Sequence, residues 1–600
     1  MKNYIFAFII VLTINTCFSQ KLINDSIGLN ELVVTGSKTR ISHKLVPLSV
    51  SQVNRQDLEN SGQTNILPAL NYFSPGIFVT QRNISGFGVS TGGAGSISMR
   101  GISSSPNTEV LVMIDGHPQY QGIFGHPLAD SYLSSEVEKV EIIRGPASIL
   151  YGSNAMAGAI NIITKQQKED GLKVNANAQY GSYNTQGYGG SIGYKKDKFS
   201  IFAAANHNQT DGSRPNTPFA ITNGFTKLGY EISKNFTATV DYSLVQYSAK
   251  DTVYSPPSRL GINILRSNYA LAIENKYDKT DGAFKIYKNS GDHTLSDGFH
   301  SNDFISGAML YQTLKIFKGN TITAGAEIKQ YGGSANTGFK KDSLINIEEW
   351  AGYAYVQQSL FEKLTISGGI RLENNSKYGT ELLPMGGLTY NLNSITTFKT
   401  SISKGFRSPT VMEMYLYAAN PNLQPERMRN YEVSWLQSLG DNKLQLELTL
   451  YKVVGDNLIQ VVGFGPTAKR QNVGHFNNQG VEFSAKYALN KNLFVHANYS
   501  YLDLGKAIMA APRQQANISA NYKYKVWNIN LSTQYIERLY TSMTTIQPQY
   551  LLLNARISAH PLKLLEIFIA ANNILNQTYE INKGYAMPGI NFNAGINIKL

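Results

Sequence analysis

Hydrophobic and polar residues alternate one by one along most of the chain beyond residue 165. In KLQLELTLY the four leucines share one face, and Gln445, Glu447, Thr449 and Tyr451 share the other. The segments NFTATVDYSL and NLFVHANYSY alternate in the same way. Because successive side chains of a strand point to opposite faces, this pattern predicts many antiparallel strands with one apolar and one polar face. Soluble sheets share this property, so the pattern alone leaves soluble and membrane classes open.

Residues 46–165 have a different pattern of hydrophobic and polar positions. Residues 52–60 and 65–72 have the pattern of short helices, whereas EVLVMIDG and VEKVEIIRG have the pattern of strands. Glycine-rich loops separate these segments. The pattern predicts a compact α/β domain that precedes the strand-rich region.

The composition favours a membrane barrel for residues 166–600. Charged residues make up 16% of the chain, against roughly 25% in soluble domains, and the chain has 36 tyrosines but only 3 tryptophans. No apolar run approaches the roughly 20 residues that a membrane helix needs. Low charge, abundant tyrosine and sustained alternation are typical of a transmembrane β-barrel.

The N-terminus has the features of an export signal. Lys2 precedes an apolar stretch from Tyr4 to Leu12, and small residues precede Gln20, which predicts a signal peptide over residues 1–19. The alternative is a lipoprotein signal in which Cys17 is acylated. Cys17 is the only cysteine, so cleavage after residue 19 leaves a chain without disulfides or thiolate chemistry.

The net charge of +13 has several explanations. No basic cluster is interleaved with aromatic residues, so nucleic acid is not a predicted partner. For an exported protein, lipopolysaccharide phosphates, an anionic substrate and a general lysine bias remain as explanations.

Five blocks, in order along the chain, resemble TonB-dependent outer-membrane receptors over essentially the whole mature length. They are ELVVTGS, SMRGISSSPNTEVLVMIDG, VEKVEIIRGPASILYGSNAMAGAINIITK, GFRSPTVMEMY with NPNLQPERMRNYEVSW, and NNILNQTYE with the terminal NAGINIKL. The terminal block also resembles the assembly signal of bacterial outer-membrane proteins, through Asn593, Gly595, Ile598 and Leu600.

The resemblance implies a 22-stranded antiparallel transmembrane β-barrel with an N-terminal α/β plug domain inside its lumen. It divides the chain into a signal peptide (1–19), a periplasmic segment (20–45) with an energy-coupling box at 31–37, a plug (46–165) and a barrel (166–600). The coupling residues would be Glu31, Leu32, Val33, Val34 and Thr35. The implied partners are a TonB-type periplasmic energy transducer with its inner-membrane motor, the barrel assembly machinery, and outer-membrane lipid and lipopolysaccharide. The receptor is expected to act as a monomer without a cofactor.

The resemblance and the alternation together predict how the plug is held. In NYEVSW and GVEFSAKY the apolar residues must face lipid, which turns Glu432 and Glu482 into the lumen. The plug brings Arg100 and Arg144 into the same space, and we expect the four side chains to form a plug–wall quartet of ion pairs. The alternative is that the acids face channel water and the arginines meet backbone carbonyls.

Two glycine-rich plug loops are expected to face outward and contact the ligand, as in similar receptors. The candidate ligand-binding residues are Gln81, Arg82, Asn83, His117, Gln119, Tyr120 and His126. Each of the two histidines precedes a proline. A metal or haem site is one interpretation, and a turn that the proline favours is the one we prefer, because the spacing matches no zinc pattern. We therefore predict no resident metal.

The predicted function is energy-coupled uptake of a scarce, bulky nutrient across the bacterial outer membrane, with an iron–siderophore chelate as the first candidate. Cobalamin, haem and a copper complex are alternative cargoes, and a passive porin or an adhesin is the alternative of another class. The glycine-rich SGFGVSTGG lacks the features of a dinucleotide fingerprint or a P-loop, and the sequence contains no His-Glu-x-x-His motif. The sequence therefore predicts no enzyme.

Overall fold

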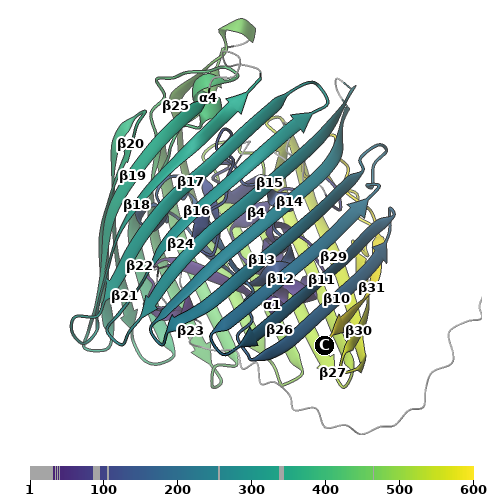
Figure 1. Cartoon of the computed structure of the whole chain (residues 1–600). Helices are drawn as coiled ribbons and strands as arrows, with labels where there is room; N and C mark the ends of the chain where they lie inside the picture. Colours follow the sequence, from purple (N-terminus) through teal and green to yellow (C-terminus); the bar gives the residue numbers. More distant parts are fainter. Residues whose placement is uncertain are drawn as a thin grey trace, which may run out of the picture.

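The computed structural model describes residues 32–33, 35–36, 38, 41–85, 95–103, 107–254, 257–336, 344–463 and 465–600. The predicted signal peptide lies outside these residues, as do Glu31 and Val34 of the predicted coupling box. In this part of the chain, strands β10 to β31 form one closed antiparallel barrel of 22 strands (Figure 1). The predicted fold class is confirmed.

The barrel strands follow one another in chain order around the wall. They are β10 (Gly171–Gly181), β11 (Thr185–Lys196), β12 (Phe199–Thr210), β13 (Phe219–Ser233), β14 (Phe236–Tyr254), β15 (Pro257–Lys276), β16 (Thr280–Leu295), β17 (His300–Leu314), β18 (Asn320–Ala335), β19 (Ile345–Leu360), β20 (Leu364–Asn375), β21 (Gly379–Asn391), β22 (Thr396–Arg407), β23 (Glu426–Leu439), β24 (Leu444–Val462), β25 (Lys469–Ala488), β26 (Leu493–Asp503), β27 (Gln514–Tyr524), β28 (Trp527–Ser542), β29 (Thr545–Leu562), β30 (Leu565–Asn572) and β31 (Asn591–Lys599). The last strand pairs with the first from Asn593 opposite Gly181 to Lys599 opposite Asn175. We call this junction the closing seam.

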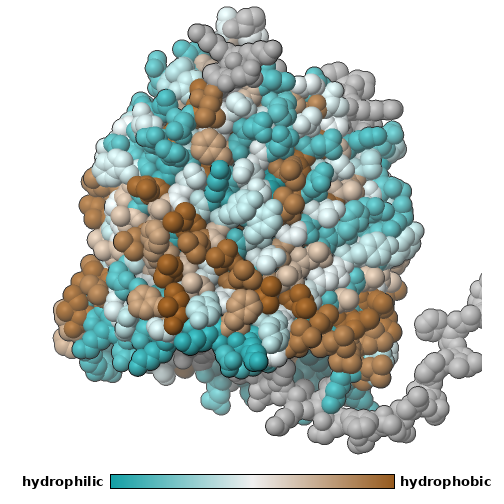
Figure 2. Space-filling view, viewed as in Figure 1, coloured by the Kyte–Doolittle hydropathy of each residue, from teal (hydrophilic) through white to brown (hydrophobic). Residues whose placement is uncertain are grey.

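Alternation along the strands separates a lipid face from a lumen face. Val433 and Leu450 are 54% and 52% exposed on the outer surface, whereas Glu432 is 3% exposed on the inner one. Figure 2 shows apolar residues gathered in a band over the lower part of the wall, with hydrophilic residues above and below it. Among the described residues, no helix has the length and apolar character to cross a bilayer.

The two ends of the barrel differ in the length of their connections. Turns such as 197–198, 525–526 and 563–564 join strands at the end that carries the C-terminus, whereas segments 408–425 and 573–590 join strands at the other end. Outer-membrane barrels have short periplasmic turns and longer extracellular loops, so the end with the long segments faces outward.

The plug fills the lumen with a five-stranded mixed sheet in the order β3-β8-β9-β6-β7 and several short helices. Its elements are β3 (Ser49–Asn54), α1 (Arg55–Ser61), α2 (Ile66–Phe73), β4 (Ile77–Val79), β5 (Ile97–Met99), β6 (Val110–Ile114), β7 (His117–Pro118), η2 (Ala129–Ser131), η3 (Ser134–Glu136), β8 (Val137–Arg144), α3 (Ser148–Tyr151) and β9 (Gly158–Thr164). Before it lie β1 (Leu32–Val33), β2 (Ile41–Ser42) and η1 (His43–Leu45), and the outer segments add α4 (Val411–Tyr415) and η4 (Gly465–Thr467).

The first plug helix begins three residues later than the pattern predicts. Residues 49–54 form the edge strand β3, and Asn54 then caps α1 through a reciprocal pair of hydrogen bonds with Asp57. The helix ends at Ser61, and the following Gly62, with a φ of 67°, adopts the left-handed conformation that glycine tolerates best. The two predicted plug strands are present as β6 and β8.

Candidate functional site: the plug, its ionic anchor and its coupling segment

Arg100 joins the plug to two barrel strands. Its Nε and NH2 donate to the two carboxylate oxygens of Glu482 on β25, each at 2.9 Å, and its NH1 donates to Glu432 on β23 at 2.6 Å. The guanidinium lies 4.4 Å from the ring centroid of Tyr451. Burial alone would lower the pKa of Arg100, but Glu482 and Glu432 raise it above its ordinary value. The side chain therefore stays charged although it is 1% exposed.

Arg144 reaches a third strand. Its NH2 donates to Glu447 on β24 at 3.2 Å, and its NH1 lies 3.5 Å from a carboxylate oxygen of Glu482. Glu432, the other acid of the predicted quartet, accepts from Arg100 and also from the backbone N and the hydroxyl of Ser49, both at 2.8 Å. We refer to Arg100, Arg144, Glu432, Glu447 and Glu482 as the ionic cluster.

The sequence pattern already placed Glu447 on a polar face, but we did not assign it to the cluster. The structure brings together all four residues of the predicted quartet and adds Glu447 as the hydrogen-bond partner of Arg144. Further plug–wall contacts were not predicted: Lys227 pairs with Asp115 at 2.8 Å, and Asp303 accepts from the backbone N of Gly122 at 2.8 Å.

Glycine lets the plug approach the ionic cluster closely. Gly76 has a φ of 72°, and a Cβ at this position would overlap Oε1 of Glu482. The backbone oxygen of Gly76 also accepts from the N of Arg100 at 2.9 Å, which fixes the turn that carries the arginine. A side chain here would disturb both the turn and the carboxylate.

The predicted coupling segment lies against the plug inside the barrel. Leu32 and Val33 pair with Ser42 and Ile41 as a two-stranded sheet. Thr35 donates from its backbone N and its hydroxyl to Oε2 of Glu141, at 2.8 and 2.7 Å, and is fully buried. One edge of β1 and the backbone N of Thr35 are therefore already engaged within the chain.

Two further side chains of the plug hold Thr35. Tyr151 donates its hydroxyl hydrogen to the backbone oxygen of Thr35 at 2.9 Å, and Asn161 donates to its hydroxyl at 3.0 Å. Nearby, the ammonium of Lys38 lies 3.8 Å from the ring centroid of Tyr151. Burial lowers the pKa of Lys38 to about 7, with Glu327 opposing this shift and Arg371 adding to it.

The first predicted ligand loop meets the outer segments of the barrel. Asn83 donates to Thr217 at 3.0 Å and accepts from the N and hydroxyl of Ser213. The guanidinium carbons of Arg82 and Arg214 lie 4.3 and 4.6 Å from the ring centroid of Tyr585. The backbone oxygen of Gln81 accepts from Asn582 at 3.4 Å. Two cations therefore lie beside one aromatic ring where the plug meets the outer segments, and Arg82, Arg214 and Tyr585 are 2%, 8% and 9% exposed.

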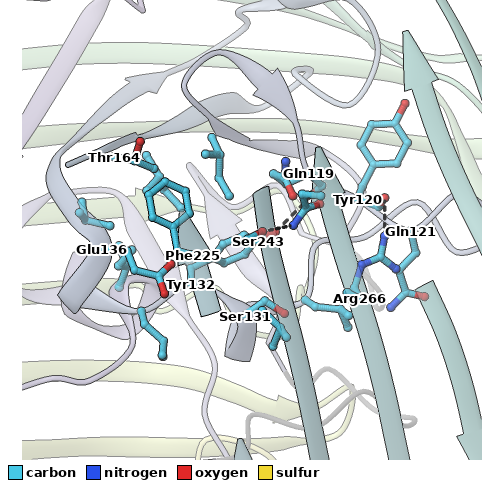
Figure 3. A pocket seen from close by; sticks show the side chains of 18 residues that line it. Gln119, Tyr120, Gln121, Ser131, Tyr132, Glu136, Thr164, Phe225, Ser243 and Arg266 are labelled. Atoms are coloured by element: carbon cyan, nitrogen blue, oxygen red, sulfur yellow. Dashed lines mark hydrogen bonds between the residues drawn. The ribbon is translucent and has the colours of Figure 1, made fainter. Parts of the chain in front are cut away.

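The first residues of the second predicted ligand loop are packed against the wall, whereas Ile123 reaches the outer segment 408–425. His117, Gln119 and Tyr120 are 2%, 5% and 6% exposed. Figure 3 shows Gln119, Tyr120 and Gln121 beside a cavity of about 30 Å³, where Arg266 of the barrel donates to the backbone oxygen of Tyr120. A direct role in ligand binding stays a prediction that requires this loop to move.

The two histidines occupy different surroundings. His117 forms β7, next to the turn at the end of β6, and stacks on Tyr287 with ring centroids 5.8 Å apart. His126 lies beside Phe124, and its Nδ1 is 2.9 Å from the oxygen of Pro127. Burial lowers the pKa of His117 to about 3 and that of His126 to about 4, so both rings are neutral. Among the described residues, no group of three or more His, Cys, Asp or Glu could hold a metal ion.

Comparison with known proteins agrees with this architecture. Residues 42–159 match the family described as TonB-dependent Receptor Plug Domain, and residues 164–574 match TonB dependent receptor-like, beta-barrel. The vitamin B12 transporter BtuB of Photobacterium profundum is 24% identical over 552 residues, which cover 86% of each chain. The iron-regulated outer membrane virulence protein of Vibrio cholerae is 24% identical over 569 residues, covering 85% of this chain and 82% of the relative.

Solved structures share the fold at lower identity. The siderophore receptor PirA of Pseudomonas aeruginosa superposes with a TM-score of 0.76 and 18% identity, over 92% of this chain and 99% of the receptor. The ferripyoverdine receptor of the same organism superposes with a TM-score of 0.80 and 14% identity, over 96% of this chain and 90% of the receptor. The plug, the barrel and the two family matches together show that the chain belongs to the TonB-dependent receptors of the outer membrane.

Proposed function

We propose that the chain imports an anionic iron chelate of the siderophore type across the outer membrane, driven by a TonB-type energy transducer. Members of the family are transporters and receptors, which gives the coarse function. The observation that carries the finer proposal is the pair Arg82 and Arg214 over Tyr585, at the junction of the plug with two outer segments. Guanidinium groups bind carboxylates and other oxyanions with directional hydrogen bonds, which suits a negatively charged chelate.

The position of the coupling segment supports an energised mechanism. Strand β1 pairs with β2 and Glu141 holds Thr35, so the whole segment becomes available to a partner strand only after these contacts break. Binding at the plug apex would favour this release, and the transducer would then pull on an exposed strand edge. A passive porin does not require such a segment.

A deletion tests the energised mechanism. We expect removal of residues 31–35 to abolish growth under iron limitation in a strain where this receptor supplies the iron. Removal of residues 21–25, which shortens the same predicted periplasmic segment equally, should leave growth intact. Normal growth of the first variant would contradict the proposal and favour a passive pore.

A second cargo, cobalamin, is supported by the similarity to a vitamin B12 transporter. The same strain distinguishes the two when iron and cobalamin are limited separately. Loss of growth only under cobalamin limitation would overturn the iron chelate and retain the coupling mechanism. Haem and a copper complex are tested by the same design.

A further inference from the structure

Three neighbouring cavities follow the closing seam between the plug and the wall. Their volumes are about 260, 210 and 120 Å³ from the periplasmic end to the outer end. The lower two share Arg55, Lys165 and Asn175 as lining residues. The upper two share Gly62, Gln63, Thr64, Gln179, Asn208 and Asn593. We call this chain of cavities the seam column, and the six shared residues its neck.

The seam column differs chemically from the opposite wall. The described residues that line its upper cavity include amides such as Asn83, Gln179 and Asn208, and no lysine, arginine, histidine, aspartate or glutamate. Charged side chains line the lower two cavities, among them Arg55, Lys165 and the ion pair of Arg556 with Glu566. Amides donate and accept hydrogen bonds without binding a charge tightly, so they offer polar solutes a low-affinity surface. The ionic cluster, by contrast, lies on β23 to β25.

Strand β11 keeps this part of the wall thin. Its lumen-facing positions carry glycine at 187, 189 and 193. A Cβ at Gly189 would overlap Oδ1 of Asn206 and lie 2.6 Å from Oδ1 of Asn177. A Cβ at Gly187 would lie 2.6 and 2.8 Å from the amides of Gln179 and Asn208. The atoms nearest to the missing side chains of β11 are therefore the ends of amide side chains, which can rotate, and not packed apolar residues.

The plug side of the neck lies close to the coupling segment in the chain. Gly62, Gln63 and Thr64 follow directly after β3 and α1, and β3 is the edge strand of the plug sheet. An edge strand is hydrogen-bonded to only one neighbouring strand. A force applied at the N-terminus therefore acts on β3 and residues 62–64 before it acts on the interior strands of the sheet.

We propose that the seam column is the path along which the cargo crosses the barrel, and that the neck at Gln179, Asn208 and Asn593 is its closed gate in the resting state. This inference rests on the proposed uptake function and adds the route. The cavities are too small for a bulky chelate, so passage requires residues 62–64 to move away from β10, β12 and β31.

Widening the neck tests the route without the cargo. We expect the variant Gln179→Ala/Asn208→Ala/Asn593→Ala, purified as the full chain in proteoliposomes, to raise glycerol and water permeability several-fold in stopped-flow light scattering. The control Asn289→Ala/Gln357→Ala/Asn375→Ala removes three lumen-facing amides from β16, β19 and β20 and should leave permeability at the wild-type level. The single variant Asn208→Gly, with a smaller increase, replaces the triple variant if the latter does not migrate as a folded barrel in unheated electrophoresis.

Filling the space should reverse the effect. Addition of Gly187→Leu to the widened variant should return glycerol permeability to the wild-type level, because Gly187 is the β11 position that faces Gln179 and Asn208. Gly187→Leu alone should slow receptor-dependent growth under nutrient limitation. An unchanged permeability of the folded widened variant, an equal increase in the control, or a leak that persists with Gly187→Leu would each overturn the route. Failure of the uptake function would be seen separately, as growth that survives deletion of residues 31–35.

Discussion

Arg100→Ala should release the plug from the wall while the barrel stays folded. The change leaves the buried carboxylates of Glu432 and Glu482 without their shared cation, and these side chains are 3% and 1% exposed. Breaking a buried pair in this way costs about 3–5 kcal/mol. At about 1.4 kcal/mol for each factor of ten, the population of plug that has left the wall rises roughly 100- to several-thousand-fold.

Amide hydrogen exchange measured by mass spectrometry reads this change directly. Peptides from β5 and β8 should exchange faster by that factor, whereas peptides from the barrel strands should be unchanged. Arg100→Lys keeps the charge but loses the two-pronged contact with Glu482, so we expect an intermediate rate. Arg427→Ala breaks a partly exposed pair within the barrel wall and serves as the control. Equal exchange of the plug in Arg100→Ala and Arg427→Ala would refute the reasoning.

Four other predictions concern the coupling segment, the plug apex and the ionic cluster. Glu141→Gln weakens the acceptor of both Thr35 hydrogen bonds, which should shift the equilibrium from the docked to the released coupling segment by about 1–3 kcal/mol. A spin label at Leu32→Cys should therefore become more mobile, and unchanged mobility would contradict the docking of this segment. The same label should gain mobility as the pH falls from about 10 to 7. In this range Lys38 binds a proton when the segment is released but not when it is docked, because burial lowers the pKa of the docked Lys38 to about 7. Lys38→Met should remove this pH dependence. Arg82→Gln/Arg214→Gln should weaken binding of an anionic ferric chelate at least about tenfold and leave the thermal stability of the barrel unchanged, and equal affinity would exclude these arginines from the site. Gly76→Ala should accelerate plug exchange in the same peptides as Arg100→Ala, and wild-type rates would show that Glu482 can retreat at little cost.

Period-two alternation predicts much of the barrel because lipid on one side and the lumen on the other leave little freedom. The inward direction of Glu432 and Glu482 follows from that rule alone. Which acid pairs with which arginine does not follow from the alternation, because the pairing depends on the relative register of β23, β24 and β25. For this reason Glu447 stood on a predicted polar face and was still missed as the partner of Arg144.

Local sequence also misplaced one histidine and left one contact unseen. A glycine-rich stretch with His-Pro predicts an outward turn, but pairing of β7 with β6 places His117 beneath the wall residue Tyr287. In the coupling segment, an extended pattern predicts a strand that seeks a partner. It cannot predict that Glu141, 106 residues later, already holds Thr35.

The ionic cluster also constrains the order of folding. Arg100 is separated from Glu432 by 332 residues and from Glu482 by 382. Contacts of such high order form late, because the intervening chain must be ordered first. The ionic cluster can therefore be completed only after β25 has joined the sheet, so the plug reaches its final anchoring late in the assembly of the barrel.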